Sequence, residues 1–228
     1  MGVTTKDIAK ICGVSRTTVT RALSNQGRIN EKTKENILNT AKELGYRPDL
    51  LARGLVKGKT MYIGVVVFDV KNRYFSQMLS SIETEAKKRG YFTNITLHEK
   101  DKEMEIELIQ RLVDYHMDGL ILSPVNKGKN FAEFLKGLNV PLVIIGNKIA
   151  SDIPFVGINE QKASKESIEL ILKKGYKRIV FVCPPLADQK EENVYSHQQR
   201  EKGFLGIMST SRVLSKYTYG KGNDKSLS

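Results

Sequence analysis

The chain has 228 residues, 40% of them hydrophobic and 27% charged, a composition that supports folded domains and excludes a disordered chain. No apolar run approaches the roughly 20 residues that span a bilayer. The N-terminal MGVTTKDIAK also lacks the apolar core of a secretory signal, so we expect a cytoplasmic protein. The net charge of +12 is uneven, because residues 1–60 carry 12 Lys or Arg against five Asp or Glu. This excess favours a polyanion partner, with a solubilising surface as the alternative.

Few residues in the chain suggest chemistry. Cys12 and Cys183 are too few and too distant for a disulfide framework, and small buried residues are a simpler reading than a redox pair. His98, His116 and His197 have no metal-ligand spacing, so we expect no metal and no cofactor. A GxSxG, a phosphate-binding loop and a GxGxxG are all absent, which argues against an enzyme.

The first 46 residues contain three short helical patterns. Thr4 and Asp7 have capping-box spacing at the start of the first helix, and Gly13 can take the positive φ of the turn after it. Ser15 caps a second helix that runs to about Ser24, and Asn30 caps a third that ends at Leu44 before Gly45. The residues expected to be buried are Ile8, Ala9, Ile11, Val14, Val19, Leu23, Ile37, Leu38, Ala41 and Leu44. This spacing predicts a helix-turn-helix, with a helical hairpin of another kind as the alternative.

The second helix carries the side chains expected to bind DNA. A recognition helix enters the major groove N-terminus first, where Arg16 and Thr17 could reach base edges. Thr20, Arg21 and Asn25 are better placed for phosphates, which set register rather than sequence. The alternative is a solvated helix face. The predicted set for this part of the chain is Thr4, Thr5, Ser15, Arg16, Thr17, Thr20, Arg21 and Asn25.

The segments VTTKDIAKICGVSRTTVTRAL, NEKTKENILNTAKELGYRPDLLARGL and IGVVV follow one another in an order that closely resembles the LacI/GalR family of bacterial repressors. The resemblance implies a hinge helix from Pro48 to Leu55 that folds on DNA, with Leu55 wedged into the minor groove beside Ala52 and Arg53. Gly54 departs from the pattern and costs about 1 kcal/mol of helix propensity, so this hinge should fold less readily.

From Met61 the apolar period changes to that of buried parallel strands alternating with amphipathic helices. Strands are predicted at 61–69, 92–98, 118–124, 140–146, 155–158 and 178–183, and helices at 74–89, 104–115, 131–138 and 163–174. The pattern predicts an α/β domain after the all-α helix-turn-helix headpiece. The segments NRYF, VDYHMDGLIL and VPLVIIGN resemble the α/β periplasmic-binding-protein-like domain of the same family, and the resemblance implies a complete first lobe and a partial second lobe. The expected boundaries are 1–46 for the headpiece, 47–60 for hinge and linker, 61–162 and 163–206 for the lobes, and 207–228 for an atypical basic tail.

Ligands of such sheets bind beyond the carboxyl ends of the strands, where Asp69, Tyr74, Phe75, Ser123, Pro124 and Asn147 lie. The resemblance implies effector contacts from Phe75, Asn147 and Arg200, the last in an RxxGF motif, and Tyr74 joins this predicted set. Core packing is the alternative for Phe75. Asn147 departs from a common aspartate, and Ile158-Asn159 departs from the family's Asp-Asn pair.

The resemblance implies a transcriptional regulator, of repressor type, that binds a pseudo-palindromic operator in double-stranded DNA as a homodimer and responds to a small-molecule effector such as a sugar. Members of the family are longer, so we expect a truncation or frameshift near residue 206 that impairs the effector response. Two other readings remain open: a cytoplasmic sugar-binding module without regulatory DNA binding, and a Rossmann-like enzyme. No membrane partner is expected.

Overall fold

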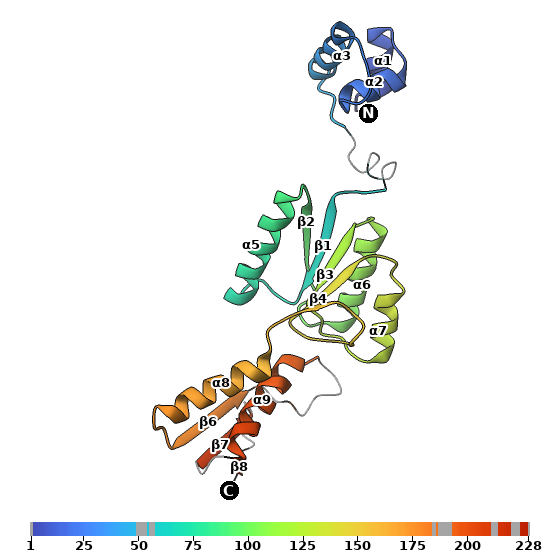
Figure 1. Ribbon diagram of the computed structural model, residues 1–228. Helices are drawn as coiled ribbons and strands as arrows, with labels where there is room; N and C mark the ends of the chain where they lie inside the picture. Colours follow the sequence, from blue (N-terminus) through green and yellow to red (C-terminus); the bar gives the residue numbers. More distant parts are fainter. Residues whose placement is uncertain are drawn as a thin grey trace. The chain divides into compact units, whose positions relative to one another are not determined.

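The computed structural model describes residues 2–48, 54, 58–183, 186 and 193–210, together with the backbone of 214–219 and 224–227 (Figure 1). The chain divides into two compact units, Met1–Gly58 and Lys59–Ser228, and each is described by itself. Among the helices of the described part, none is both long and apolar enough to cross a membrane. The predicted hinge residues Ala52, Arg53 and Leu55 lie outside the described residues.

The first unit contains the three predicted helices, α1 (Thr5–Cys12), α2 (Arg16–Leu23) and α3 (Glu31–Glu43). The backbone N–H and the hydroxyl of Thr4 both donate to Oδ2 of Asp7, at 2.8 and 2.7 Å, which fixes the start of α1. Gly13 ends α1 at φ +68°, a conformation that side chains disfavour. The Ser15 hydroxyl accepts from the Thr18 N–H at 3.1 Å, so α2 begins where the sequence predicts.

The core of the first unit is formed by Ile8, Ala9, Val19, Ala22, Ile37 and Ala41. Two expected core residues are exposed instead: Ile11 is 60% exposed and Leu38 is 42% exposed. Helix geometry explains both corrections, because successive residues turn by roughly 100°. The stripe through Ile8, Ala9 and Cys12 leaves Ile11 on the flank of α1, and Leu38 is displaced from Ile37 in the same way.

The second unit begins with a five-stranded parallel sheet in the order β2-β1-β3-β4-β5, which confirms the predicted α/β class. Its elements are β1 (Tyr62–Val67), α5 (Arg73–Lys88), β2 (Phe92–Leu97), α6 (Lys102–Asp114), β3 (Gly119–Leu122), α7 (Lys129–Lys136), β4 (Leu142–Ile145) and β5 (Phe155–Val156). Asp118 secures the first strand, since its carboxylate accepts from the N–H of Thr60 at 2.7 Å and of Met61 at 3.0 Å.

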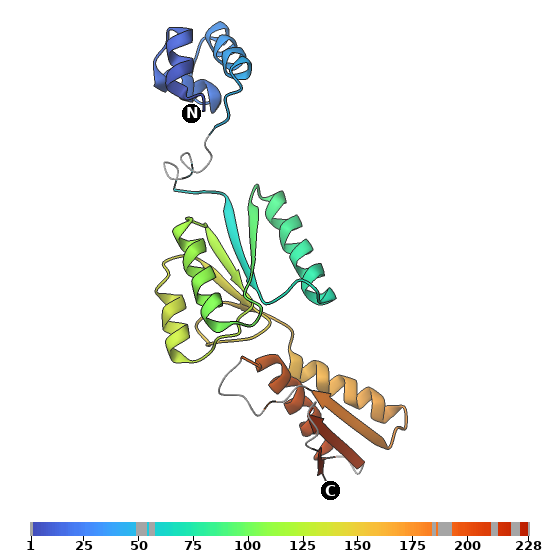
Figure 2. The same ribbon diagram turned by 180° about the vertical axis from the view of Figure 1, so that it is seen from behind.

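Helix α5 covers one face of this sheet and α6 with α7 the other (Figures 1 and 2). The strand period separates the two cores: Val65 and Val67 pack with α5, whereas Val66 packs with α6 and α7. Gly64 has no room for a side chain, because a Cβ there would lie 2.7 Å from Cδ2 of Leu120. Both faces are therefore closed, and the strand ends are the part of the sheet left for polar side chains.

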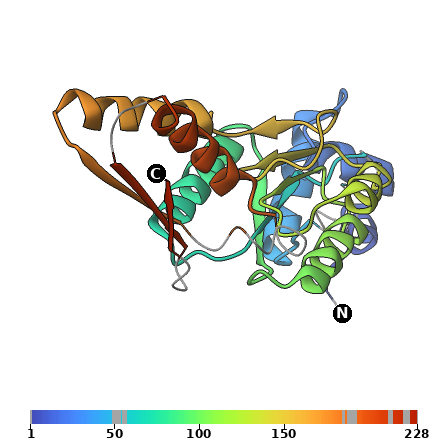
Figure 3. The ribbon, with the colours of Figure 1, turned by 90° about the horizontal axis from the view of Figure 1, so that it is seen from below.

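The chain continues into α8 (Glu160–Lys173), β6 (Arg178–Cys183), α9 (Tyr195–Met208), β7 (Leu214–Tyr219) and β8 (Asp224–Leu227). Helices α8 and α9 lie side by side (Figure 3) and enclose an apolar cluster of Ile168, Ile179, Phe204 and Met208. The structure differs here from the tail expected after residue 206. Met208 follows Phe204 by one helical turn and is buried, and β7 pairs with β6 in parallel and with β8 antiparallel.

Candidate functional sites

Helix α2 separates a buried side from a polar one. Val19 and Ala22 are buried against α1 and α3. Arg16, Thr17, Thr20 and Arg21 are all exposed, and their spacing of one, four and five residues groups them on the opposite face. The helix holds no acidic residue, so nothing on it would repel a phosphate. The structure thus brings the predicted base-contacting and phosphate-contacting side chains of α2 together on one surface.

The other predicted DNA-binding residues border this surface. Thr4 is exposed and Thr5 half-buried at the start of α1, while Asn25 is exposed just beyond α2 at φ +53°. Ser15 is exposed, but its hydroxyl is engaged in the cap and also pairs with the Thr18 hydroxyl at 2.9 Å. The N-terminus of α2 is therefore held rigidly by its own cap, and Arg16 and Thr17 project from a fixed turn.

At the carboxyl edge of the parallel sheet, buried His98 joins two strand ends. Its Nδ1 accepts from the Lys100 N–H at 3.2 Å, so the proton lies on Nε2, which donates to the Ser123 carbonyl at 3.1 Å. Burial lowers the pKa of His98, while the bond to Ser123 opposes this effect. The imidazole is therefore a neutral brace between the ends of β2 and β3, with no unused nitrogen for a ligand.

Glu105, fully buried on α6, holds the loop after β3. Its Oε1 accepts from the Val125 N–H at 3.1 Å, and its Oε2 accepts from the Asn126 N–H at 2.8 Å and from the Asn126 side-chain amide. Burial raises the pKa of Glu105, and these three donors counteract the rise. The carboxylate shapes the 123–126 loop, in which the sequence places two candidate residues.

The two aromatic candidates differ in exposure. Phe75 is 8% exposed and packs edge-on against Phe68, with ring centroids 4.4 Å apart, within the α5-side core. Tyr74 is 49% exposed at the start of α5 and contacts the Phe75 ring at 5.2 Å. Phe75 thus has a packing role, and of the two Tyr74 is the ring presented at the strand ends.

Asn147, after β4, is bonded to the segment that begins α9. Its Nδ2 donates to the Asn193 carbonyl at 2.7 Å, and its Oδ1 accepts from the Ser196 N–H at 3.2 Å. Asn193 is itself buried: its N–H donates to the Val125 carbonyl at 2.9 Å, and its Nδ2 donates to the carbonyl of Lys148 at 3.3 Å. The amide of Asn147 therefore joins the two lobes of the second unit.

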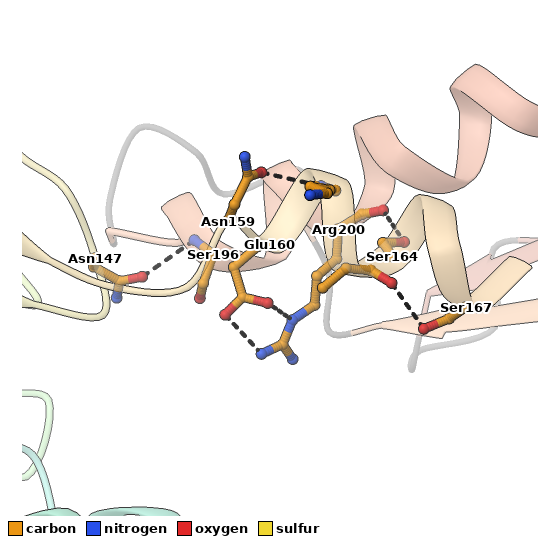
Figure 4. Close-up of polar contacts among 9 residues, drawn as sticks. Asn147, Asn159, Glu160, Ser164, Ser167, Ser196 and Arg200 are labelled. Carbon is orange, nitrogen blue, oxygen red and sulfur yellow. Dashed lines mark hydrogen bonds and ion pairs between the residues drawn. The ribbon is translucent and has the colours of Figure 1, made fainter.

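Arg200, on α9, lies beside Glu160 in the first turn of α8 (Figure 4). Its Nε lies 2.7 Å from Oε2 of Glu160 and its Nη2 lies 3.0 Å from Oε1, a two-point ion pair. The pKa of Arg200 is raised, first by this contact. Tyr74 also raises the pKa of Arg200, as the smallest of the causes.

Sequence reasoning missed Glu105, Asn126, Asn193 and Glu160. A signal existed for Glu105, because a carboxylate four residues before Ile109 lies on the buried stripe of its helix. The partners of the others come from segments more than 20 residues away, which no local pattern shows. Among the described residues, no cluster of three or more His, Cys, Asp or Glu could hold a metal.

Comparison with known proteins matches residues 4–49 to bacterial regulatory proteins of the lacI family and residues 63–226 to a periplasmic binding protein domain. Catabolite control protein A of Priestia megaterium is 29% identical over 97% of this chain and 68% of its own. The regulator MalR of Streptococcus pneumoniae serotype 4 (strain ATCC BAA-334 / TIGR4) is 33% identical over 80% of this chain and 57% of its own.

The fold also matches a Lac repressor dimer solved with operator and the anti-inducer ONPF, with a TM-score of 0.80 at 19% identity. The aligned part is 96% of this chain and 66% of that one. This chain therefore spans between 57% and 68% of the length of the three proteins named here. The two matched segments occur in the order and at the positions that the helix-turn-helix and the parallel sheet occupy. The chain belongs to the lacI family of bacterial regulatory proteins.

Proposed function

We propose that this chain is a DNA-binding transcriptional repressor that binds a pseudo-palindromic operator in double-stranded DNA as a homodimer. The observation that carries the proposal is the polar face of α2, where Arg16, Thr17, Thr20 and Arg21 are exposed on a helix held by the Ser15 cap. A bidentate arginine–guanine contact and threonine contacts suit the major groove. DNA as the partner would place the protein in the cytoplasm, and the relatives are named as regulators rather than enzymes.

Within this proposal the side chains divide into two roles. Arg16 and Thr17, in the first turn of α2, contact base edges. The remaining candidates contact phosphates and fix the register of the headpiece: Thr4, Thr5, Ser15, Thr20, Arg21 and Asn25. In the hinge, Ala52, Arg53 and Leu55 contact the minor groove, with Leu55 as the wedge. Replacing Leu55 by Ala should weaken operator binding more than binding to random DNA, and equal losses would contradict the wedge.

The second unit binds a small-molecule effector, of a sugar-like kind, at the carboxyl edge of the sheet. Tyr74, exposed at the start of α5, and Arg200, on α9, are the direct contacts. Asn147 and Phe75 complete the set in supporting roles, because the Asn147 amide is bonded to Asn193 and Ser196 and the Phe75 ring is packed in the core. In this proposal the DNA-binding headpiece ends at residue 46, the hinge and linker span 47–60, and the effector-binding domain begins at residue 61.

The proposal is tested by fluorescence anisotropy with two labelled duplexes, one selected by repeated enrichment on the protein and one random. Specific binding should exceed random binding by about a thousandfold or more. Its logarithm should fall linearly with log salt, with a slope near −0.9 per phosphate neutralised. Sedimentation with the selected duplex should show two chains on one two-fold site. Equal affinity for both duplexes would reject the regulator and favour the ligand-binding module.

A further inference from the structure

Arg200 does not stand as an unpaired cation at the proposed effector site. Both oxygens of the Glu160 carboxylate face its guanidinium, at 2.7 and 3.0 Å (Figure 4). The Glu160 side chain is 13% exposed and that of Arg200 is 49% exposed, so the carboxylate is the enclosed partner. Two-point arginine–carboxylate contacts are among the strongest charge-assisted hydrogen bonds in proteins.

The backbone around this pair is also held in place. A Cβ at Gly203, one turn after Arg200, would lie 2.4 Å from the Gln161 carbonyl oxygen, so α9 approaches α8 as closely as glycine allows. The Ser164 hydroxyl donates to the Arg200 carbonyl at 2.7 Å. Glu160 itself lies in the first turn of α8, where the helix dipole stabilises a negative charge. These contacts fix the backbone of α9 at Arg200 against the first turn of α8, where Glu160 lies.

Two other basic side chains lie near the ion pair of Arg200 and Glu160. His197 is partly buried on α9, and burial, together with Arg200 and Lys100, lowers its pKa. Lys100 is exposed on the opposite lobe with its ammonium 5.8 Å from the centre of the Phe68 ring. A negatively charged ligand group that reached Arg200 would meet the Glu160 carboxylate at once.

We propose that Glu160 determines the ligand class of this site: it excludes anionic groups from Arg200, so that the effector presents uncharged hydroxyl groups there. The inference rests on the proposed effector-binding role of the second unit. The ion pair uses two of the five N–H donors of a guanidinium, and the others suit hydroxyl acceptors. Glu160 can in turn accept from an uncharged hydroxyl, whereas its negative charge repels an anionic group.

The test measures whether inorganic phosphate reaches Arg200. The ¹⁵N–¹H signal of Arg200 Nε, assigned by its loss in Arg200→Lys, is followed during phosphate titration at constant ionic strength. Wild type should show little response, whereas Glu160→Gln should bind phosphate at Arg200 about tenfold more tightly or better. Glu166→Gln is the matched control, because it removes a carboxylate of the same helix that pairs with exposed Lys162 at 3.7 Å. It should behave like wild type.

Two results would overturn the inference: an equal phosphate response of Arg200 in wild type and Glu160→Gln, or an absent response in Glu160→Gln. Circular dichroism melting verifies that each variant is folded, and Glu160→Ala repeats the titration if the glutamine variant is not. Operator binding is measured on the same samples. If the wild-type chain does not bind operator, the repressor role is refuted, but the phosphate titration still tests Glu160. The two proposals can therefore be rejected independently.

Discussion

The two units of this chain prepare their candidate sites in opposite ways. In the first unit the functional side chains of α2 are exposed and the structure under them is a small apolar core. In the second unit the polar residues at the strand ends are bonded to one another, through His98, Glu105, Asn126, Asn147 and Asn193. DNA contacts can therefore be removed singly in the first unit, whereas a change in the second unit disturbs a connected network.

The largest effect is expected from the core of the first unit. Ile37→Ala removes a fully buried side chain and should destabilise this unit by about 2–5 kcal/mol, enough to unfold a domain with so small a core. Hydrogen exchange should then rise over residues 2–48 and stay unchanged over the parallel sheet. Leu38→Ala, next to it and 42% exposed, is the control and should change stability by about 0.5 kcal/mol or less. A loss of protection in both units would contradict the division.

Glu105→Gln tests the network of the second unit. All three partners of Glu105 are N–H donors. In glutamine an NH2 group replaces one of the two accepting oxygens, so a donor would face a donor. We expect a loss of about 1–3 kcal/mol in urea unfolding of the second unit. The exposed Glu107→Gln, on the same helix, should be close to neutral. Unchanged stability of Glu105→Gln would show that the buried carboxylate is already protonated and replaceable.

Arg16→Ala tests the exposed surface of the first unit. Loss of one bidentate base contact should weaken operator binding by about 10- to 100-fold and relax specificity at one base pair, with no change in folding. Anisotropy with single-base operator variants measures both effects. Lys42→Ala, which removes an equal charge from exposed α3, should weaken operator and random DNA alike and only slightly. Similar losses for the two variants would remove Arg16 from the base-reading set.

The smallest effect is a pH dependence of the second unit. Burial lowers the pKa of His98 in the folded chain. When the pH falls below 6.5, the ordinary pKa of histidine, this side chain is therefore protonated more readily in the unfolded chain than in the folded one. The stabilisation is complete above pH 6.5 and falls as the pH decreases, by no more than about 1.4 kcal/mol per pH unit for one proton. His98→Gln should flatten this slope between pH 7.5 and 5.5. The pKa of His197 is lowered as well, so His197→Gln is measured separately to show how much of the slope comes from that residue. A slope unchanged in His98→Gln would assign the dependence to other groups.

The sequence by itself determined the element order, because caps, turn glycines and apolar periods act over a few residues. The caps at Thr4 and Ser15 and the turn at Gly13 fix the bounds of the first two helices. The change in the spacing of apolar residues at Met61 predicts the parallel sheet. The same local information misplaced Ile11 and Leu38, since a helix of eight or 13 residues can be apolar over a wider arc than its neighbours cover.

Only the tertiary structure decided what the polar residues of the second unit do. The sequence predicted one effector site formed by Tyr74, Phe75, Asn147 and Arg200. In the structure the Phe75 ring packs in the core, and the Asn147 amide donates to the Asn193 carbonyl. Glu160 and Arg200 are 40 residues apart in the chain and meet because α8 and α9 pack closely at Gly203. Hydrogen bonds act over about 3 Å, so their partners depend on which distant segments the packing brings together.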